Sequence, residues 1–126
     1  MGKEKLTRKG IFLQEHEHAT IKVLLLAGYD IQLIPPVQGK GIKTPDLTID
    51  GVPWEMKAPM GNGKRTVQNT LIRAGKQSEN IIIDLRRSKM QEEQAIRDFE
   101  KEFSTTKKLK RMKIITKDKE ILDFSK

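Results

Sequence analysis

Residues 43–57 of the chain read KTPDLTIDGVPWEMK. Two short strand-like runs, 47–49 and 52–56, stand on either side of Asp50-Gly51. An Asp-Gly pair between two such runs is the strongest local signal for a β-hairpin with a two-residue type I′ turn. We therefore predict that this stretch forms a hairpin and that the other elements of the chain pack around it.

Three charged side chains meet at one point of this predicted hairpin. Strand pairing brings Asp46 and Glu55 side by side, and Lys57 shares a face with Glu55 because residues two apart on a strand point the same way. Two carboxylates suit Mg²⁺, with Mn²⁺ or Zn²⁺ as alternatives, and the main-chain carbonyl of Met56 is a candidate third ligand. The Lys57 ammonium would orient the attacking water or stabilise developing charge. The pattern therefore predicts a phosphodiester-cleaving site with Asp46, Glu55 and Lys57 as catalytic residues and the two carboxylates as metal ligands. The alternative interpretation is an ordinary solvated hairpin face.

The segments on both sides of the hairpin predict an α-β-β-β-α-β-α-β-β order. Gly28 would end the first helix, Thr66 would cap the second, and the apolar run at 80–85 is typical of a strand buried on both faces. We expect a single α/β (α+β) domain over residues 1–126, with a mixed central sheet flanked by helices and a basic loop at 37–43. The predicted helices are 11–27, 66–78 and 89–103, and the predicted strands are 31–34, 47–49, 52–56, 80–85, 112–116 and 120–124.

Composition limits the class of protein. The chain has 126 residues, 36% of them hydrophobic and 33% charged, and a net charge of +8. The absence of cysteine excludes disulfides, thiolate metal ligands and a cysteine nucleophile. A basic balance favours a polyanionic partner such as nucleic acid, and the few aromatic residues argue against stacking of bases on an aromatic platform. No apolar run is long enough for a membrane span or follows a signal-peptide pattern, so we expect no membrane association and a cytoplasmic location.

On the first helix, Phe12, Ala19, Val23 and Leu26 form the predicted apolar face. His16 falls near the centre of that face. We interpret it as a partly buried histidine rather than as a zinc ligand.

The hairpin within this order of helices and strands resembles the PD-(D/E)XK nuclease superfamily, whose core has the order α-β-β-β-α-β. Pro45-Asp46 and Glu55-x-Lys57 match the superfamily motif, and the resemblance covers roughly residues 10–85. It implies a metal-dependent nuclease with its site on the middle hairpin.

The same resemblance extends the site to both neighbouring helices. A glutamate on the first helix often joins the site in this superfamily, which implies Glu17 as a further catalytic residue, with Glu15 as its rival. The helix after the hairpin often contributes basic or glutamine side chains, and its N-terminus can hold a phosphate. A solvated helix start is the alternative interpretation of these residues. The implied substrate-binding residues are Lys64, Arg65, Thr66 and Gln68, with Arg73 two turns further along.

Several shorter stretches add a finer resemblance. They are Glu17 with Ala19, LAGYDI at 26–31, KTPD at 43–46, IDG at 49–51, EMK at 55–57, and IIIDL at 81–85 after a helix that opens at Thr66. Together they are similar to the C-terminal toxin domains of contact-dependent growth inhibition proteins, the CdiA-type tRNA nuclease domains, and to relatives on mobile elements. This resemblance implies RNA, and tRNA in particular, as the substrate. It also implies action in the cytoplasm of a target cell and a neutralising immunity protein as partner.

Two other functions stay open from the sequence. One is a DNA endonuclease of the same fold, of the restriction or resolvase type. The other is a catalytically silent nucleic-acid-binding module. Two carboxylates that face phosphate argue against a silent module, because they repel a polyanion unless a cation lies between them.

Overall fold

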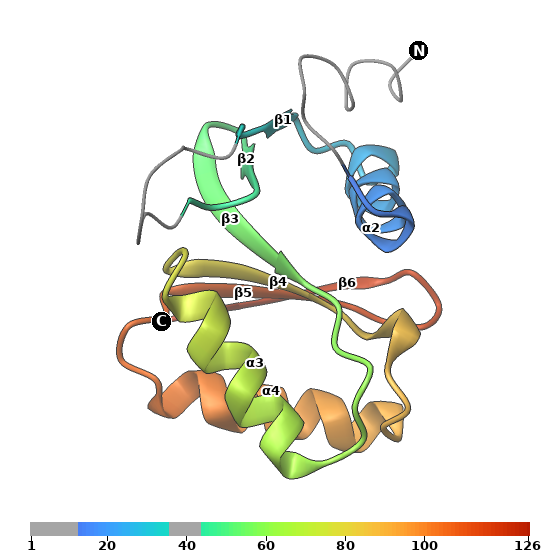
Figure 1. Cartoon of the computed structure of the whole chain (residues 1–126), viewed down its shortest axis with the longest axis vertical. Coiled ribbons are helices and arrows are strands. Elements are labelled where there is room, and N and C mark those ends of the chain that lie inside the picture. The colour runs from blue at the N-terminus through green and yellow to red at the C-terminus, as the bar shows by residue number, and fades with distance from the viewer. Residues whose placement is uncertain (1–12, 36–43) are drawn as a thin grey trace.

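The computed structural model describes residues 13–35 and 44–126 and arranges them around a six-stranded mixed sheet. The strands lie in the sheet in chain order, with α2 on one face and α3 and α4 on the other (Figure 1). Neighbouring strands are antiparallel except for β3–β4 and β4–β5, which are parallel and are joined by the crossover helices α3 and α4. The predicted element order and the mixed sheet flanked by helices are confirmed. The elements are α2 (Glu15–Leu26), β1 (Ile31–Leu33), β2 (Leu47–Ile49), β3 (Val52–Lys57), α3 (Lys64–Gly75), β4 (Asn80–Asp84), the 3₁₀-helix η1 (Leu85–Arg87), α4 (Glu92–Thr105), β5 (Arg111–Ile115) and β6 (Ile121–Ser125).

The predicted hairpin is present as β2 and β3. Asp50 and Gly51 have φ angles of 51° and 85°, the two positive values that a type I′ turn requires. Leu47 pairs with Trp54 across the hairpin, so both point into the core beneath α2. The Asp-Gly signal therefore fixes both the turn and the register of the strands.

Helix α2 begins later than the sequence suggested. Gln14 is the N-cap residue, and Glu17 reaches back to the Gln14 backbone N–H in a capping box. Leu13 and Gln14 are therefore not helical, and the predicted residues 11 and 12 lie outside the described ranges. The helix ends at Leu26, and Gly28 follows with a φ of 95°, as a C-terminal glycine should.

The predicted apolar face of this helix was right at Val23 and wrong at Leu26. Leu26 is 77% exposed, whereas Ile21 and Leu24 are fully buried and Val23 is buried beside them. Ile21 and Leu24 pack against the apolar side of the hairpin. The buried face of the helix therefore includes residues that the predicted face left out. Phe12 lies outside the described ranges.

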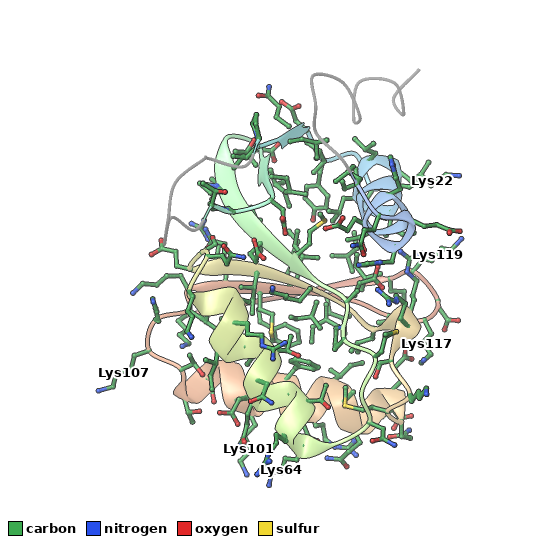
Figure 2. The ribbon with its side chains drawn as sticks, in the orientation of Figure 1. Lys22, Lys64, Lys101, Lys107, Lys117 and Lys119 are labelled. Carbon is green, nitrogen blue, oxygen red and sulfur yellow. The ribbon has the colours of Figure 1, made fainter. Side chains whose placement is uncertain are left out.

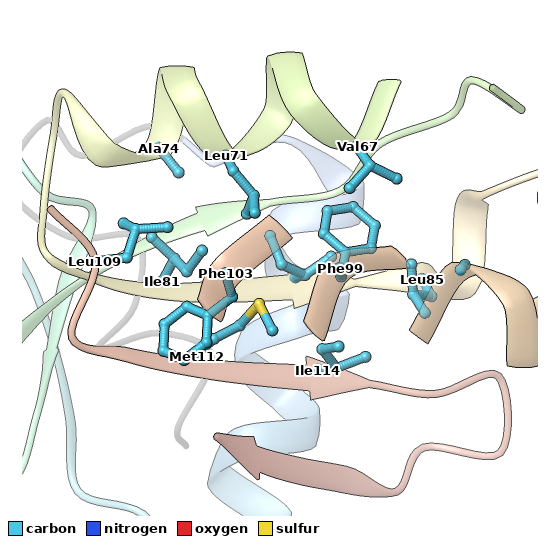
Figure 3. Close-up of a cluster of buried hydrophobic side chains, with 12 residues drawn as sticks. Val67, Leu71, Ala74, Ile81, Leu85, Phe99, Phe103, Leu109, Met112 and Ile114 are labelled. Carbon is cyan, nitrogen blue, oxygen red and sulfur yellow. The ribbon is translucent and has the colours of Figure 1, made fainter. Parts of the chain in front are cut away.

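A second and larger core lies on the opposite face of the sheet. Figure 3 shows how side chains from α3 and α4 meet those of β4 and β5. All five residues of β4 are buried, which confirms the prediction of a strand covered on both faces. Val67, Leu71 and Ala74, spaced three to four residues apart, form the inner face of α3. The main contributors are Val67, Leu71 and Ala74 from α3, Phe99 and Phe103 from α4, Ile81 and Ile83 from β4, and Met112 and Ile114 from β5.

The start of α3 differs from the prediction. Gly63 is the N-cap residue and supplies no side-chain hydrogen bond, and the helix begins at Lys64. Thr66 is therefore not the cap. It lies in the first turn, where its N–H donates to the carbonyl of Gly63 at 3.0 Å. A Cβ on Gly61 would collide with the Thr66 hydroxyl, so a glycine is needed for the loop to pass this close to the helix.

The remaining boundaries shift by a few residues from those predicted, as helix and strand ends commonly do. The predicted loop at 37–43 lies outside the described residues. Within the described ranges, no helix combines the length and apolar character needed to cross a bilayer.

Candidate active site

The candidate site forms where the two hairpin strands separate. The N–H of Asp46 donates to the carbonyl of Trp54 at 3.1 Å, which is the last main-chain bond of the hairpin. One step further along β3, the N–H of Met56 donates instead to Oδ2 of Asp46 at 2.9 Å. At this point of β3, the Asp46 carboxylate therefore accepts the hydrogen bond that a neighbouring strand would otherwise accept. This bond holds Asp46 beside Glu55.

Glu55 is buried at this point, with only 2% of its surface exposed. Its Oε2 lies 3.3 Å from Nζ of Lys57 and accepts a hydrogen bond from Nε2 of Gln77 at 3.2 Å. Its Oε1 is also buried and receives no hydrogen bond from any group in the described part of the chain. An ionised Glu55 thus has one oxygen that is satisfied and one that is not.

Burial and the neighbouring charge alter the acidity of both carboxyl groups. Loss of solvation, together with the negative charge of Asp46, raises the pKa of Glu55 to about 8, although Lys57 opposes the shift. Burial also raises the pKa of Asp46, against the hydrogen bond from Met56. The pair therefore favours holding one proton between its two carboxyl groups near neutral pH.

A divalent cation would relieve the same problem as that proton. It would neutralise two adjacent carboxylates and give the unsatisfied Oε1 of Glu55 a partner, and oxygen donors are the ligands that Mg²⁺ prefers. The donor set therefore fits such an ion. The described residues do not, however, bring together three or more acidic or histidine side chains around one point. Ligands beyond Asp46 and Glu55 would come from the main chain, substrate and water, as is usual for Mg²⁺.

Glu17 is the helix carboxylate that lies toward this pair. Its negative charge contributes to the raised pKa of Asp46, while one of its oxygens accepts a hydrogen bond from the Gln14 N–H at 2.8 Å. Glu15 instead lines a separate cavity with Asp84. Of the two glutamates, Glu17 is therefore the one whose charge acts on Asp46, and its role in the site stays a prediction.

A cavity of about 330 Å³ adjoins Lys57 and extends over α3. Its wall includes Thr66, Asn69 and Arg73, so it combines hydroxyl, amide and guanidinium groups next to the Lys57 ammonium. Such groups hydrogen-bond phosphate and sugar oxygens in nucleic-acid complexes. The side chain of Lys57 is 28% exposed, so it reaches from the buried pair into this cavity.

Three of the predicted substrate-binding residues do not join this cavity. Lys64, Arg65 and Gln68 are exposed on the outer side of α3 and are not part of its wall, whereas Thr66 is. Figure 2 shows Lys64 pointing outward from the end of that helix. The prediction had placed the whole helix start at the site, but of the four predicted residues only Thr66 lines this cavity, together with Asn69 and Arg73 further along α3.

Sequence reasoning missed Gln77. It follows α3 in a turn that is fixed to β3, because Ser78 Oγ and Asn80 Nδ2 donate to the carbonyl of Pro53 at 3.2 and 3.1 Å. That docking carries the Gln77 amide to Glu55. No local signal in the sequence marks Gln77, because its position depends on the parallel pairing of β3 with β4.

Comparison with known proteins gives results at two levels. A chain in the structure of the CdiA-CT/CdiI toxin and immunity complex from Burkholderia pseudomallei is similar to this chain, with a TM-score of 0.66 and 22% sequence identity over 97% of this chain and 96% of that one. At this identity the likeness concerns the fold. Nothing among the curated proteins matches the chain.

The family comparison is more specific. The family model described as the contact-dependent growth inhibition CdiA C-terminal domain matches residues 43–121, which is more than half of the chain and includes the whole hairpin. The structural likeness covers almost all of the remaining residues. This chain therefore belongs to the CdiA C-terminal domain family of contact-dependent growth inhibition.

Proposed function

We propose that the chain is a metal-dependent nuclease that hydrolyses phosphodiester bonds, with RNA, and tRNA in particular, as its favoured substrate. The observation that carries the proposal is the pair of adjacent carboxyl groups of Asp46 and Glu55, of which Glu55 is buried and Asp46 half-buried, with Lys57 3.3 Å from Glu55. Two adjacent carboxylates out of contact with water are costly for a folded protein. Such groups are found mainly at functional sites. The cavity that Lys57 lines beside this pair supports a catalytic use.

Each residue has a distinct part in this proposal. Asp46 and Glu55 would hold a divalent cation, with the carbonyl of Met56 as a candidate further ligand. When bound, the cation would lower the pKa of a water and neutralise charge on the phosphate. Lys57 lies where its ammonium can stabilise negative charge that develops on the substrate. Glu17 would add negative charge at the Asp46 side, and Gln77 holds Glu55 in place by its hydrogen bond.

The assignment of substrate is supported more broadly. Membership of a toxin domain family and the net charge of +8 favour a nucleic acid as the target. The match of the hairpin to the PD-(D/E)XK motif supports membership of that nuclease superfamily. DNA is the second candidate substrate, because the same arrangement of carboxylates and lysine would act on either phosphodiester.

A partner protein is also part of the proposal. The similar solved structure is a toxin and immunity complex, which supports an immunity protein that neutralises the present chain. Its action would then take place in the cytoplasm of a target cell that lacks this partner.

The test is to incubate the purified protein with total RNA and, separately, with plasmid DNA, in Mg²⁺ and in EDTA. We expect cleavage of RNA, tRNA above all, in Mg²⁺ and its loss in EDTA. Asp46→Ala and Glu55→Ala should each abolish it, whereas Lys101→Ala, an exposed change on α4, should not. Cleavage of plasmid alone would replace RNA by DNA as the substrate. If the protein cuts neither RNA nor plasmid DNA in Mg²⁺, Mn²⁺ or Zn²⁺, the proposal that it is a nuclease is refuted.

A further inference from the structure

A second cavity, of about 440 Å³, lies under the first turns of α2, where β4 ends. Its volume is within the usual range for small-molecule sites, roughly 300–1,000 Å³. Ile83 of β4 pairs with Lys57, and the next residue, Asp84, lines the cavity. The ends of β3 and β4 are thus neighbours in the sheet, with Asp84 on the face that α2 covers and Lys57 on the face that α3 covers. Its wall is formed by Glu15, His16, Ala19, Asp84, Arg86 and Arg87.

Asp84 and Arg86 form a fixed pair at the base of this cavity. Asp84 is buried and accepts hydrogen bonds from Thr20 Oγ1 at 2.6 Å and from Arg86 Nη2 at 2.8 Å and Nε at 3.0 Å. Burial acts to raise the pKa of Asp84, but these hydrogen bonds outweigh it and leave the pKa below its ordinary value. The two charges cancel each other, so the pair presents a polar but neutral surface.

The other polar groups of the wall have opposite characters. Arg87 has no carboxylate within ion-pair distance in the described ranges, and its Nη2 lies 2.8 Å from the sulfur of Met60, a weak acceptor. Glu15 offers carboxylate oxygens, and His16 offers a half-buried imidazole. The wall thus supplies one guanidinium that can donate paired hydrogen bonds, from Arg87, and one carboxylate that can accept them, from Glu15. Its charges sum to zero when the histidine is neutral.

This combination suits a nucleobase better than a phosphate group. A phosphate would be attracted by Arg87 and repelled by Glu15, whereas a base is neutral and carries donors and acceptors on separate edges. An arginine fork binds O6 and N7 of guanine with two hydrogen bonds, and N1–H and the 2-amino group of guanine can donate to a carboxylate. Single-stranded RNA is read in this way, by hydrogen bonds to the edges of bases that are unstacked.

We propose that this cavity binds an unstacked guanine of the substrate strand. Arg87 would read the O6/N7 edge and Glu15 the N1–H and amino edge, with His16 and the Asp84–Arg86 pair enclosing the base. The proposal rests on the proposed nuclease function for its biological meaning. The cavity itself can be tested by direct binding.

The first experiment measures binding of mononucleotides to the intact chain by NMR. We expect GMP to shift the amide signals of residues around the cavity, and AMP, CMP and inorganic phosphate to do so much less. Arg87→Lys keeps the charge but loses the two-pronged contact, and Glu15→Gln loses the carboxylate, so each should weaken GMP binding roughly tenfold. The exposed changes Arg97→Lys and Glu93→Gln on α4 are matched controls and should have no effect. Equal shifts with inorganic phosphate, or GMP binding unaffected by Arg87→Lys and Glu15→Gln, would overturn the proposal.

The second experiment separates this proposal from the nuclease function. Short single-stranded RNAs that differ only in one guanine are cut by the wild type and by Arg87→Lys. We expect the wild type to cut the RNA with the guanine at least about tenfold faster than the RNA without it, and Arg87→Lys to lose most of that preference. Cleavage with no base preference would leave the nuclease standing and remove the guanine site. GMP binding at the cavity without cleavage of any RNA would support the site and remove RNA cleavage from the proposed function.

Discussion

Glu55 shows how a single side chain links stability to function. Between its ordinary pKa of 4.5 and its raised value of about 8, the folded protein binds a proton that the unfolded chain releases. Stability therefore falls as pH rises through this window, because the folded state must either keep that proton or bear the buried charge. The cost is greatest above pH 8, where Glu55 is ionised in both states.

We expect Glu55→Gln to stabilise the fold at pH 8 and to abolish cleavage. The amide keeps the shape of Glu55 and can still accept from Gln77, but it has no charge to bury. The gain should be on the order of 1–3 kcal/mol, since one pKa unit corresponds to about 1.4 kcal/mol. Thermal unfolding from about pH 5 to pH 8 measures it, with the exposed change Glu100→Gln as control. The idea is wrong if Glu55→Gln unfolds more easily than wild type at pH 8 or keeps the same pH slope.

The hairpin residues illustrate what a sequence can and cannot reveal about a site. Asp46, Glu55 and Lys57 could be placed together because an Asp-Gly turn fixes the register between them. Gln77 could not, since it reaches Glu55 only through the pairing of strands far apart in the chain. Glu17 and Glu15 lie on the same helix, and only the folded chain shows that the charge of Glu17 acts on the pKa of Asp46 while Glu15 lines a separate cavity.

Helix α2 is joined to the sheet by one buried polar contact as well as by its apolar face. Thr20 donates to Asp84 at 2.6 Å, and Arg86 holds the other side of that carboxylate. This contact lies next to the turn that carries Glu17. The orientation of the helix, and with it the position of Glu17, depends on the contact.

We expect Asp84→Asn to destabilise the protein by about 2–3 kcal/mol at neutral pH, because it leaves Arg86 without its ion pair. The folded-state pKa of Asp84 is below its ordinary 3.8, so its contribution is present above that pH and is lost as pH falls through the folded-state value. Urea unfolding should thus separate variant and wild type widely at pH 7 and only slightly in strong acid.

A milder change and a control complete this test. Thr20→Val removes only the hydroxyl contact and should cost less than Asp84→Asn, while the exposed change Asp118→Asn should cost almost nothing. Equal stability of Asp84→Asn and Asp118→Asn at pH 7 would rule out a stabilising role for the pair.

Element order was predictable from the sequence, but helix starts and faces were less so. Strands follow from apolar runs and turn signals, which are local. The N-cap of α3 could not be predicted in this way. Gly63 is the N-cap residue although it has no side chain to form a hydrogen bond, and Thr66, a residue type that caps helices well, lies in the first turn. Which face of α2 is buried depends on how the helix packs against the hairpin, and no local sequence pattern determines that packing.

Over the described residues, lysines lie on several sides of the molecule. Figure 2 shows the labelled lysines projecting from α2, α3, α4, the α4–β5 connection and the β5–β6 turn. Contacts to a nucleic-acid backbone from such a surface are independent of sequence and release counterions. The net positive charge therefore explains attraction to a polyanion. Any selectivity for particular bases has to come from the residues that line the cavities.

Binding should for this reason depend steeply on salt. We expect the affinity for labelled tRNA to fall roughly tenfold or more between about 50 and about 200 mM salt, and the affinity for DNA of equal length to fall by a similar factor. Fluorescence anisotropy measures this with Lys57→Met, which should bind without cutting. An affinity that does not change with salt would show that the net charge of +8 has no part in binding.

The role of Lys57 in cutting is the part of the proposal on which the rest depends. The measurement is the initial rate of tRNA cleavage in Mg²⁺ by wild type and by Lys57→Met, with Lys101→Met as the matched exposed change and thermal unfolding to show that all three are folded. Lys57→Met should be at least about a hundredfold slower, and Lys101→Met should match the wild type, because only Lys57 adjoins the carboxylate pair. A Lys57→Met protein that cuts tRNA at the wild-type rate would contradict the proposed site.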